Sequence, residues 1–179
     1  AFTPRLFGFW VLFTAIAIFV VIRFGIFFPD RMNLEKLGWH RHALGKNLVL
    51  GVLGFGVCFL VTELALRFIG TGNFESLFTS FLNQSPEQRM AYLLIGIHAS
   101  FLEESVFRGY LQPHLASRLG KWPAILVVAF VFAFYHLQFN PIPLLVKFLF
   151  GITFGVLALS GSRIAPATAH LLICLVLAE

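Results

Sequence analysis

Six long apolar stretches limit what this chain can fold into. Each is close to the roughly 20 residues that a helix needs to cross the hydrocarbon core of a bilayer. They cover residues 6–28, 47–69, 90–111, 122–137, 144–160 and 165–178. Only 12% of the residues are charged, against about a quarter in soluble domains. We therefore expect an integral membrane protein.

The stretches predict helices and not the strands of a membrane barrel. Barrel strands alternate apolar and polar residues, whereas these segments are continuously apolar. The expected fold is all-α, a polytopic transmembrane bundle of about six helices that forms one domain, residues 1–179. Residues 6–28 are too long for a cleaved signal peptide. Residues 122–137 and 165–178 are short for full spans and would need tilt or local thinning of the bilayer.

The distribution of basic residues predicts the orientation of the bundle. The loop after the first stretch is the most basic part of the chain, whereas residues 71–88 contain no Lys or Arg. By the positive-inside rule we expect the basic loop on the cytoplasmic side, and alternation of the spans places two later connections there too. The cations are Arg31, Lys36, Arg41 and Lys46 in the loop, and Arg118, Lys121 and Arg163 in the connections.

The third stretch contains three charged residues, Glu103, Glu104 and Arg108, and Pro113 is expected to end its helix. A charge at the centre of a membrane helix costs about 2.5 to 3.5 kcal/mol, so these side chains must face protein or water. Glu104 and Arg108 are four residues apart, which predicts an ion pair on one helix face. Glu103 points about 100° away, which leaves it as a candidate general base.

Glu63 and Arg67 show the same spacing in the second stretch, and we interpret them as a structural pair. Glu103 differs because His136 and His170 lie in two other predicted spans. Exposure of any of these three side chains to lipid would cost free energy, so we expect them to converge inside the bundle. The two histidines would lie about 20 Å and 10 Å from the cytoplasmic ends of their spans, so convergence requires tilted or broken helices.

Three motifs resemble the signatures of a known family. "EESVFR" (103–108) matches EExxxR, "FAFYH" (132–136) matches FxxxH, and "HLLIC" (170–174) matches HxxxN or a variant of it. Their order is similar to that in the CPBP family, the CAAX-protease and bacteriocin-processing enzymes, also called Abi proteins. The resemblance covers residues 91–175, the expected catalytic core. Residues 1–70 carry none of it and are expected to form ancillary N-terminal helices.

The resemblance implies an intramembrane endopeptidase that uses a buried glutamate to activate water. Carried over by position, Glu103 would be the catalytic carboxylate, with Glu104 and Arg108 as its supporting pair. His136 and His170 would lie around the attacked carbonyl, where they could orient the water, stabilise the oxyanion and pass a proton to the leaving amine.

Phe132 and Cys174 are the auxiliary positions of the expected site. Phe132 begins the motif that ends at His136. Position 174 departs from the prenyl-protein proteases, which have Asn there as a plausible oxyanion donor. The S–H of Cys174 is a weak donor, so either a histidine takes over this task or catalysis is weakened.

Other functions remain open at this stage. One Glu and two His could also be the ligands of a zinc ion. The chain has no HExxH motif, however, and we expect no cofactor. A small proton-coupled transporter would also bury Glu, Arg and His, although the chain shows no inverted repeat. A family member that binds peptides without cutting them, in an immunity or chaperone role, is the third alternative.

The expected partners are the lipid bilayer and a membrane-associated peptide or lipidated protein substrate. The net charge of +5 does not indicate nucleic acid, because no aromatic and basic patch lies outside the predicted spans. The signature resembles that of bacterial members, which suggests a prokaryotic plasma membrane. The sequence does not choose among prenylated tails, bacteriocin leaders and other peptides.

Overall fold

The computed structural model describes residues 34–70, 79, 82–137 and 139–176. This part of the chain contains helices and no strand, which confirms the all-α prediction. The expected first span, residues 6–28, lies outside the described residues. The elements are α3 (Leu44–Ile69), α5 (Pro86–Glu103), η2 (Glu104–Leu111), α6 (Gln112–Leu119), α7 (Lys121–Tyr135), α8 (Pro141–Leu157), η3 (Ala158–Ser160) and α9 (Ile164–Val176).

Among the described residues, three helical segments are long and apolar enough to cross a bilayer: Leu44–Ile69, Pro86–Leu119 and Pro141–Ser160. Helices α7 and α9 are shorter apolar helices. Between Lys46 and Arg67, the outer surface of α3 is apolar, with Val49, Leu53 and Leu60 among its exposed side chains. A soluble helix would present polar side chains there, so this surface fits contact with lipid.

The longest helical path in the described part of the chain runs without a break through α5, η2 and α6. A capping box starts it, in which the Ser85 hydroxyl accepts the N–H of Gln88 and the Gln88 side chain accepts the N–H of Ser85. Element η2 is a π-helix, and the N–H of Gln112 donates to the carbonyl of Phe107, five residues earlier. Pro113 does not end the helix, so that prediction was wrong. The helix continues through α6 to Leu119.

Close contacts between helices depend on glycine. A Cβ atom at Gly51 of α3 would lie 2.7 Å from the carbonyl oxygen of Ala165 on α9. A Cβ atom at Gly54 would lie 2.5 Å from the Leu157 side chain. Cys58, one turn further on, is buried in the core of the bundle. The run "GVLGFG" therefore packs α3 against α8 and α9.

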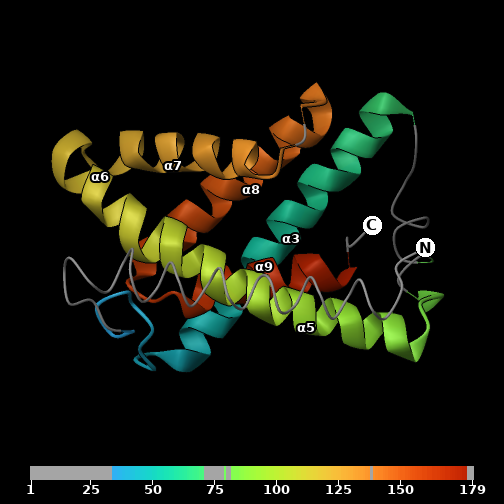
Figure 1. Ribbon diagram of the computed structural model, residues 1–179, viewed down its shortest axis with the longest axis horizontal. Coiled ribbons are helices and arrows are strands. Elements are labelled where there is room, and N and C mark those ends of the chain that lie inside the picture. The colour runs from blue at the N-terminus through green and yellow to red at the C-terminus, as the bar shows by residue number, and fades with distance from the viewer. Residues whose placement is uncertain (1–33, 71–78, 80–81, 138, 177–179) are drawn as a thin grey trace.

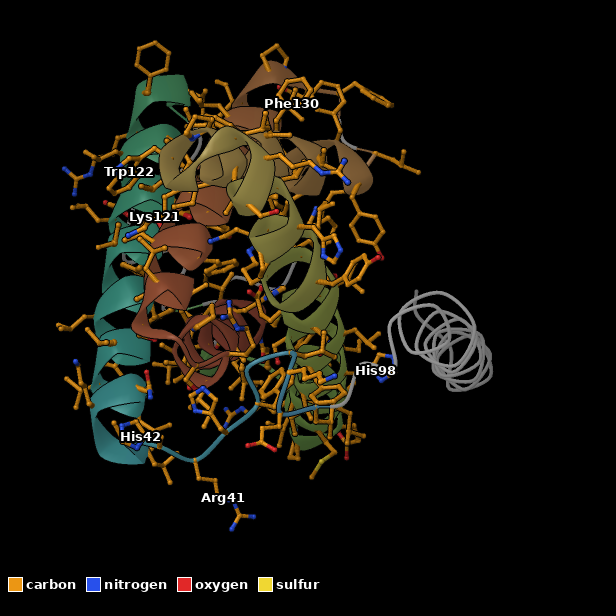
Figure 2. The ribbon with its side chains drawn as sticks, turned by 90° about the vertical axis from the view of Figure 1, so that its left-hand side faces the viewer. Arg41, His42, His98, Lys121, Trp122 and Phe130 are labelled. Atoms are coloured by element: carbon orange, nitrogen blue, oxygen red, sulfur yellow. The ribbon has the colours of Figure 1, made fainter. Side chains whose placement is uncertain are left out.

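The connections divide between two sides of the bundle. Figure 1 shows the start of α3, the turn from α6 to α7 and the connection from α8 to α9 at the left. The end of α3, the start of α5 and the connection from α7 to α8 lie at the right. The basic segments therefore share one side, as alternation predicts. In Figure 2 Arg41 points away from the bundle, beside His42. Which side faces the cytoplasm stays a prediction.

A loop of residues 34–42, here called the clasp loop, lies against the long helix at η2. The indole N–H of Trp39 donates to the Ser105 hydroxyl at 2.8 Å. Leu37 is buried, and its carbonyl oxygen would lie 2.9 Å from a Cβ atom at Gly109. The loop thus contacts the helix segment that carries the charged motif.

Candidate active site

Glu104 and Arg108 form the expected ion pair. Arg108 Nη1 donates to Glu104 Oε1 at 3.1 Å, and both side chains are 0% exposed. The spacing of four residues brings them to the same side of η2, although the helix is π and not α. Two charges removed from solvent in this way are stable only when both are paired and hydrogen-bonded.

His170 of α9 contacts both glutamates. Its Nδ1 atom lies 3.1 Å from Glu104 Oε1. Its Nε2 atom lies 3.8 Å from Glu103 Oε2, which is beyond hydrogen-bond distance. A carboxylate oxygen can only accept from a ring nitrogen, so the first contact places a proton on Nδ1. Two of the three expected motifs therefore meet directly in the structure.

Backbone and aromatic groups complete the environment of Arg108. Its Nη2 atom donates to the carbonyl of Gly151 on α8 at 3.1 Å. The guanidinium lies over the Phe132 ring, 4.4 Å from the ring centroid, and 5.2 Å from that of Phe154. A cation desolvated between aromatic faces is stabilised by the ring quadrupoles. The cation is therefore fixed by α7 and α8 as well as by Glu104.

The Phe132 ring contacts both histidines of the expected site. Its centroid lies 4.8 Å from the ring of His136 and 6.0 Å from the ring of His170, in edge-on arrangements. Phe154 stacks on His170 at 5.0 Å with an interplanar angle of 21°. These two phenylalanines restrict the orientation of the His170 ring.

His136 lies at the end of α7 and is half-buried. Its Nδ1 atom donates to the carbonyl of Phe132 at 2.8 Å, which directs Nε2 away from its own helix. His136 and His170 both contact the Phe132 ring, and this contact links His136 to the site. In the described part of the chain, His136 makes no hydrogen bond to Glu103 or Glu104. The helices around the site are inclined to one another, as convergence requires (Figure 1).

Cys174 lies one turn beyond His170, and its side chain interacts with that imidazole. Its Cβ atom faces α5, where a Cβ atom at Gly96 would lie 3.0 Å away. Both Cys174 and Cys58 are free thiols. The structure thus places the unusual residue of the third motif beside the histidine of the same motif.

Sequence reasoning missed three polar residues around the site. Lys147 of α8 interacts electrostatically with Glu103 and His136. Gln112 is buried and donates to the carbonyl of Gly155 at 3.0 Å. The charge of Lys147 inside a long apolar run is a signal that could have found it. Nothing in the sequence pairs Gln112 with residue 155.

The third missed residue is Arg163, which the sequence placed only among the basic residues of one side of the bundle. It is 8% exposed and turned inward, and its Nη1 atom donates to the carbonyl of Arg108 at 2.8 Å. The position of Arg163 in the connection before α9 is as expected, but its contact with η2 was not predicted.

A metal site was a less favoured alternative. Within the described ranges, no group of three or more His, Cys, Asp or Glu side chains is arranged to hold a metal ion. The expectation that the chain uses no cofactor remains a prediction.

Comparison with known proteins identifies the family. Residues 85–176 match the model of the Rce1-like family, described as "Type II CAAX prenyl endopeptidase Rce1-like". This range is just over half of the chain and contains all three motifs. No curated protein and no solved structure gives a significant match. The chain therefore belongs to the Rce1-like type II CAAX prenyl endopeptidase family of membrane-embedded proteases.

Proposed function

We propose that this protein hydrolyses peptide bonds of membrane-associated or lipidated peptides, with Glu103 as the general base that activates water. The observation that carries the proposal is that one imidazole, His170, faces two adjacent glutamates at different distances. Two carboxylates in different surroundings can take different roles. Glu104 is held by hydrogen bonds from Arg108 and His170. Glu103 therefore remains available to act as the general base.

Glu103 has the surroundings of a base that binds water. Its Oε2 atom is buried and has no hydrogen-bond partner among the described residues. The 3.8 Å separation from His170 Nε2 suits a small polar group that contacts both atoms, and water is the obvious candidate. A water in this position would be oriented by the imidazole and deprotonated by the carboxylate.

The proposed reaction needs no covalent intermediate with the protein. Glu103 takes a proton from water as the water oxygen forms a bond to the carbonyl carbon. The resulting oxyanion is stabilised by a hydrogen bond from a neighbouring donor. The candidates are the Cys174 thiol and a His136 imidazole protonated on both nitrogens, since the Nδ1 proton of His136 is already donated to the carbonyl of Phe132. The C–N bond then breaks, and the amine leaves with the proton that Glu103 accepted.

Glu104, Arg108 and Phe132 would act through other groups. Glu104 fixes the proton on Nδ1 of His170, so that Nε2 faces Glu103. Arg108 pairs with Glu104 and so offsets the cost of burying its carboxylate. The Phe132 ring holds the guanidinium and both imidazoles in place. These three residues are positioning residues of the proposed site.

Lys147 supports a proposal about the substrate. It lies one helical turn before Gly151, whose carbonyl binds Arg108, so it belongs to the face of α8 that lines the site. We assign Lys147 to the free carboxylate at the C-terminus of the substrate. This assignment fits a family whose description names CAAX endopeptidases, since those cut close to a chain end. For the membrane, we propose a prokaryotic plasma membrane.

The test compares two glutamates that both lie in membrane helices. The purified chain in liposomes is given a fluorescence-quenched, farnesylated peptide that ends in a CAAX sequence. We expect cleavage by the wild type, loss of at least 1,000-fold in kcat for Glu103→Gln, and near-normal activity for Glu63→Gln. Glu63 is a matched control because it also pairs with an arginine four residues later, Arg67, at 2.6 Å.

The same preparation separates the alternatives. A wild type that binds the peptide without cutting it, equally with Glu103→Gln, would support a non-catalytic binding role. Proton uptake into liposomes under a pH gradient would support a transporter. Mass spectrometry of membrane-anchored peptides that accumulate in cells with Glu103→Gln would then identify the natural substrate.

A further inference from the structure

Pro113 interrupts the hydrogen-bond ladder of the long helix just after the charged motif. The N–H of Gln112 donates to the carbonyl of Phe107, five residues earlier. The next donor in the same π ladder would be the N–H of residue 113, and its acceptor would be the carbonyl of Arg108. Proline has no N–H. The Arg108 carbonyl therefore needs a donor from elsewhere, because a buried carbonyl without one is unfavourable.

Arg163 supplies that donor. Its Nη1 atom lies 2.8 Å from the Arg108 carbonyl oxygen, and this contact is buried. Within the described residues, no carboxylate lies within ion-pair distance of its guanidinium. A buried arginine without a direct carboxylate partner is costly, so its contact with the carbonyl is a reason for its position.

The clasp loop fixes the place of Arg163. The backbone N–H of Arg163 donates to the carbonyl of Gly38 at 2.9 Å. Gly38 has a φ of +90°, and a Cβ atom there would lie 2.5 Å from Arg163 Nε. Only glycine allows both this conformation and this approach. The loop therefore covers the guanidinium and directs it towards η2.

Arg108 is thus held from two sides. Its side chain pairs with Glu104, and its carbonyl is bound by Arg163, the residue immediately before α9. His170 lies two turns further along α9 and bonds to the same Glu104. The contacts of Arg163 and His170 therefore join η2 to α9 at two points, and they fix the distance between Glu104 and His170.

We propose that Arg163 is a positioning residue that replaces the hydrogen bond missing at Pro113 and so keeps η2 in the π-helical conformation that places Glu104 against His170. The effect on catalysis rests on the proposed function. The effect on the helix does not, because it depends only on the hydrogen bond from the Arg163 side chain to the Arg108 carbonyl.

A double substitution tests the replacement directly. Arg163→Met removes the donor, and Pro113→Ala gives the Arg108 carbonyl a donor in its own helix. We expect Arg163→Met to lower kcat at least tenfold with KM within about twofold, because a buried carbonyl loses the donor that the described residues provide for it. The double variant should return to within about threefold of Pro113→Ala. Arg118→Met, an exposed arginine in α6, is the matched control and should behave as the wild type.

Hydrogen exchange measures the same relationship without any substrate. The backbone amides of residues 104–112 should exchange faster in Arg163→Met and regain protection in the double variant. If Arg163→Met fails to accumulate in membranes, recovery of the folded protein in the Pro113→Ala background is the equivalent result.

Two results would overturn the inference. One is a double variant as impaired as Arg163→Met in kcat and in exchange, because the defect would then have nothing to do with the missing N–H. The other is unchanged exchange across residues 104–112 in Arg163→Met. If the wild type cleaves no peptide, the proposed function fails, and the exchange data alone decide the role of Arg163.

Discussion

Oε1 of Glu104 lies 3.1 Å from Nδ1 of His170, although 66 positions separate the two residues in the sequence. The same oxygen accepts from Arg108. Glu104→Gln removes the negative charge and keeps the shape. We expect kcat to fall about 10- to 100-fold, as when a group that orients a histidine is changed, because the imidazole loses the partner that fixes its tautomer.

Steady-state kinetics with the quenched peptide measure this effect, and Glu63→Gln is again the control. The change should appear in kcat more than in KM, since Glu104 is not expected to contact the substrate. A Glu104→Gln protein with wild-type kcat would show that the contact with His170 has no catalytic importance.

Phe132 should matter for stability as well as for activity. Its ring lies 4.4 Å from the Arg108 guanidinium, and a desolvated cation–π contact is worth about 2 kcal/mol. Phe132→Leu keeps an apolar side chain and removes this contact. We expect the free energy of unfolding in mixed micelles to fall by about 2 kcal/mol or somewhat more, since a small cavity also forms.

The control is Phe130→Leu in the same helix. Phe130 is 56% exposed and lies at the upper edge of the bundle in Figure 2. Its substitution should change the free energy of unfolding by less than about 0.5 kcal/mol. Equal losses for the two variants would contradict a specific role for the ring of Phe132.

Gly151 should tolerate no side chain. A Cβ atom there would lie 2.8 Å from the Cα atom of Ala129 on α7, and backbone at that distance has to move. Gly151→Ala should therefore push α7 from α8 and displace the carbonyl that binds Arg108. We expect a loss of about 1 to 3 kcal/mol in stability, measured by thermal unfolding in detergent, together with lower activity.

Gly56→Ala in α3 provides the comparison, because no atom lies within 4 Å of a Cβ atom there. Alanine is also the better helix former, so this variant should be as stable as the wild type or slightly more so. Instability of both variants would indicate a general effect of alanine in these helices.

Lys147 should distinguish a peptide with a free carboxylate from its amide. For the wild type, we expect KM for the C-terminal amide to be about tenfold higher, which corresponds to one hydrogen bond to a charged group. Lys147→Met should raise KM for the carboxylate peptide to that of the amide, while Lys147→Arg keeps most of the difference. A wild type that cuts both peptides equally would rule out this role and leave the protease assignment intact.

The helices and the ion pair could be predicted because each depends on local sequence. Long apolar runs form helices in lipid whatever surrounds them, and residues four apart lie on one face. The contact between His170 and the two glutamates was predictable in outline only, since the cost of exposing charge to lipid requires convergence without giving distances. The catalytic roles of these residues stay predictions.

The π-helix and the continuation beyond Pro113 could not be predicted. A spacing of four residues between Glu104 and Arg108 is compatible with either type of helix, so the motif does not mark the wider one. Proline ordinarily ends a helix. Here Arg163, 50 residues further along the chain, donates the hydrogen bond that Pro113 cannot donate. No local sequence pattern indicates such a partner. Trp39 and Ser105 are joined in the same non-local way.

The clasp loop has a consequence for engineering. The range that matches the family begins at residue 85, but Leu37, Gly38 and Trp39 all contact the helix or the arginine that shape its centre. A graft of residues 85–176 into another scaffold would leave Gly109 without its contact with Leu37 and Ser105 without its indole donor. We therefore expect a minimal version of this protease to need a short segment from outside the range that matches the family.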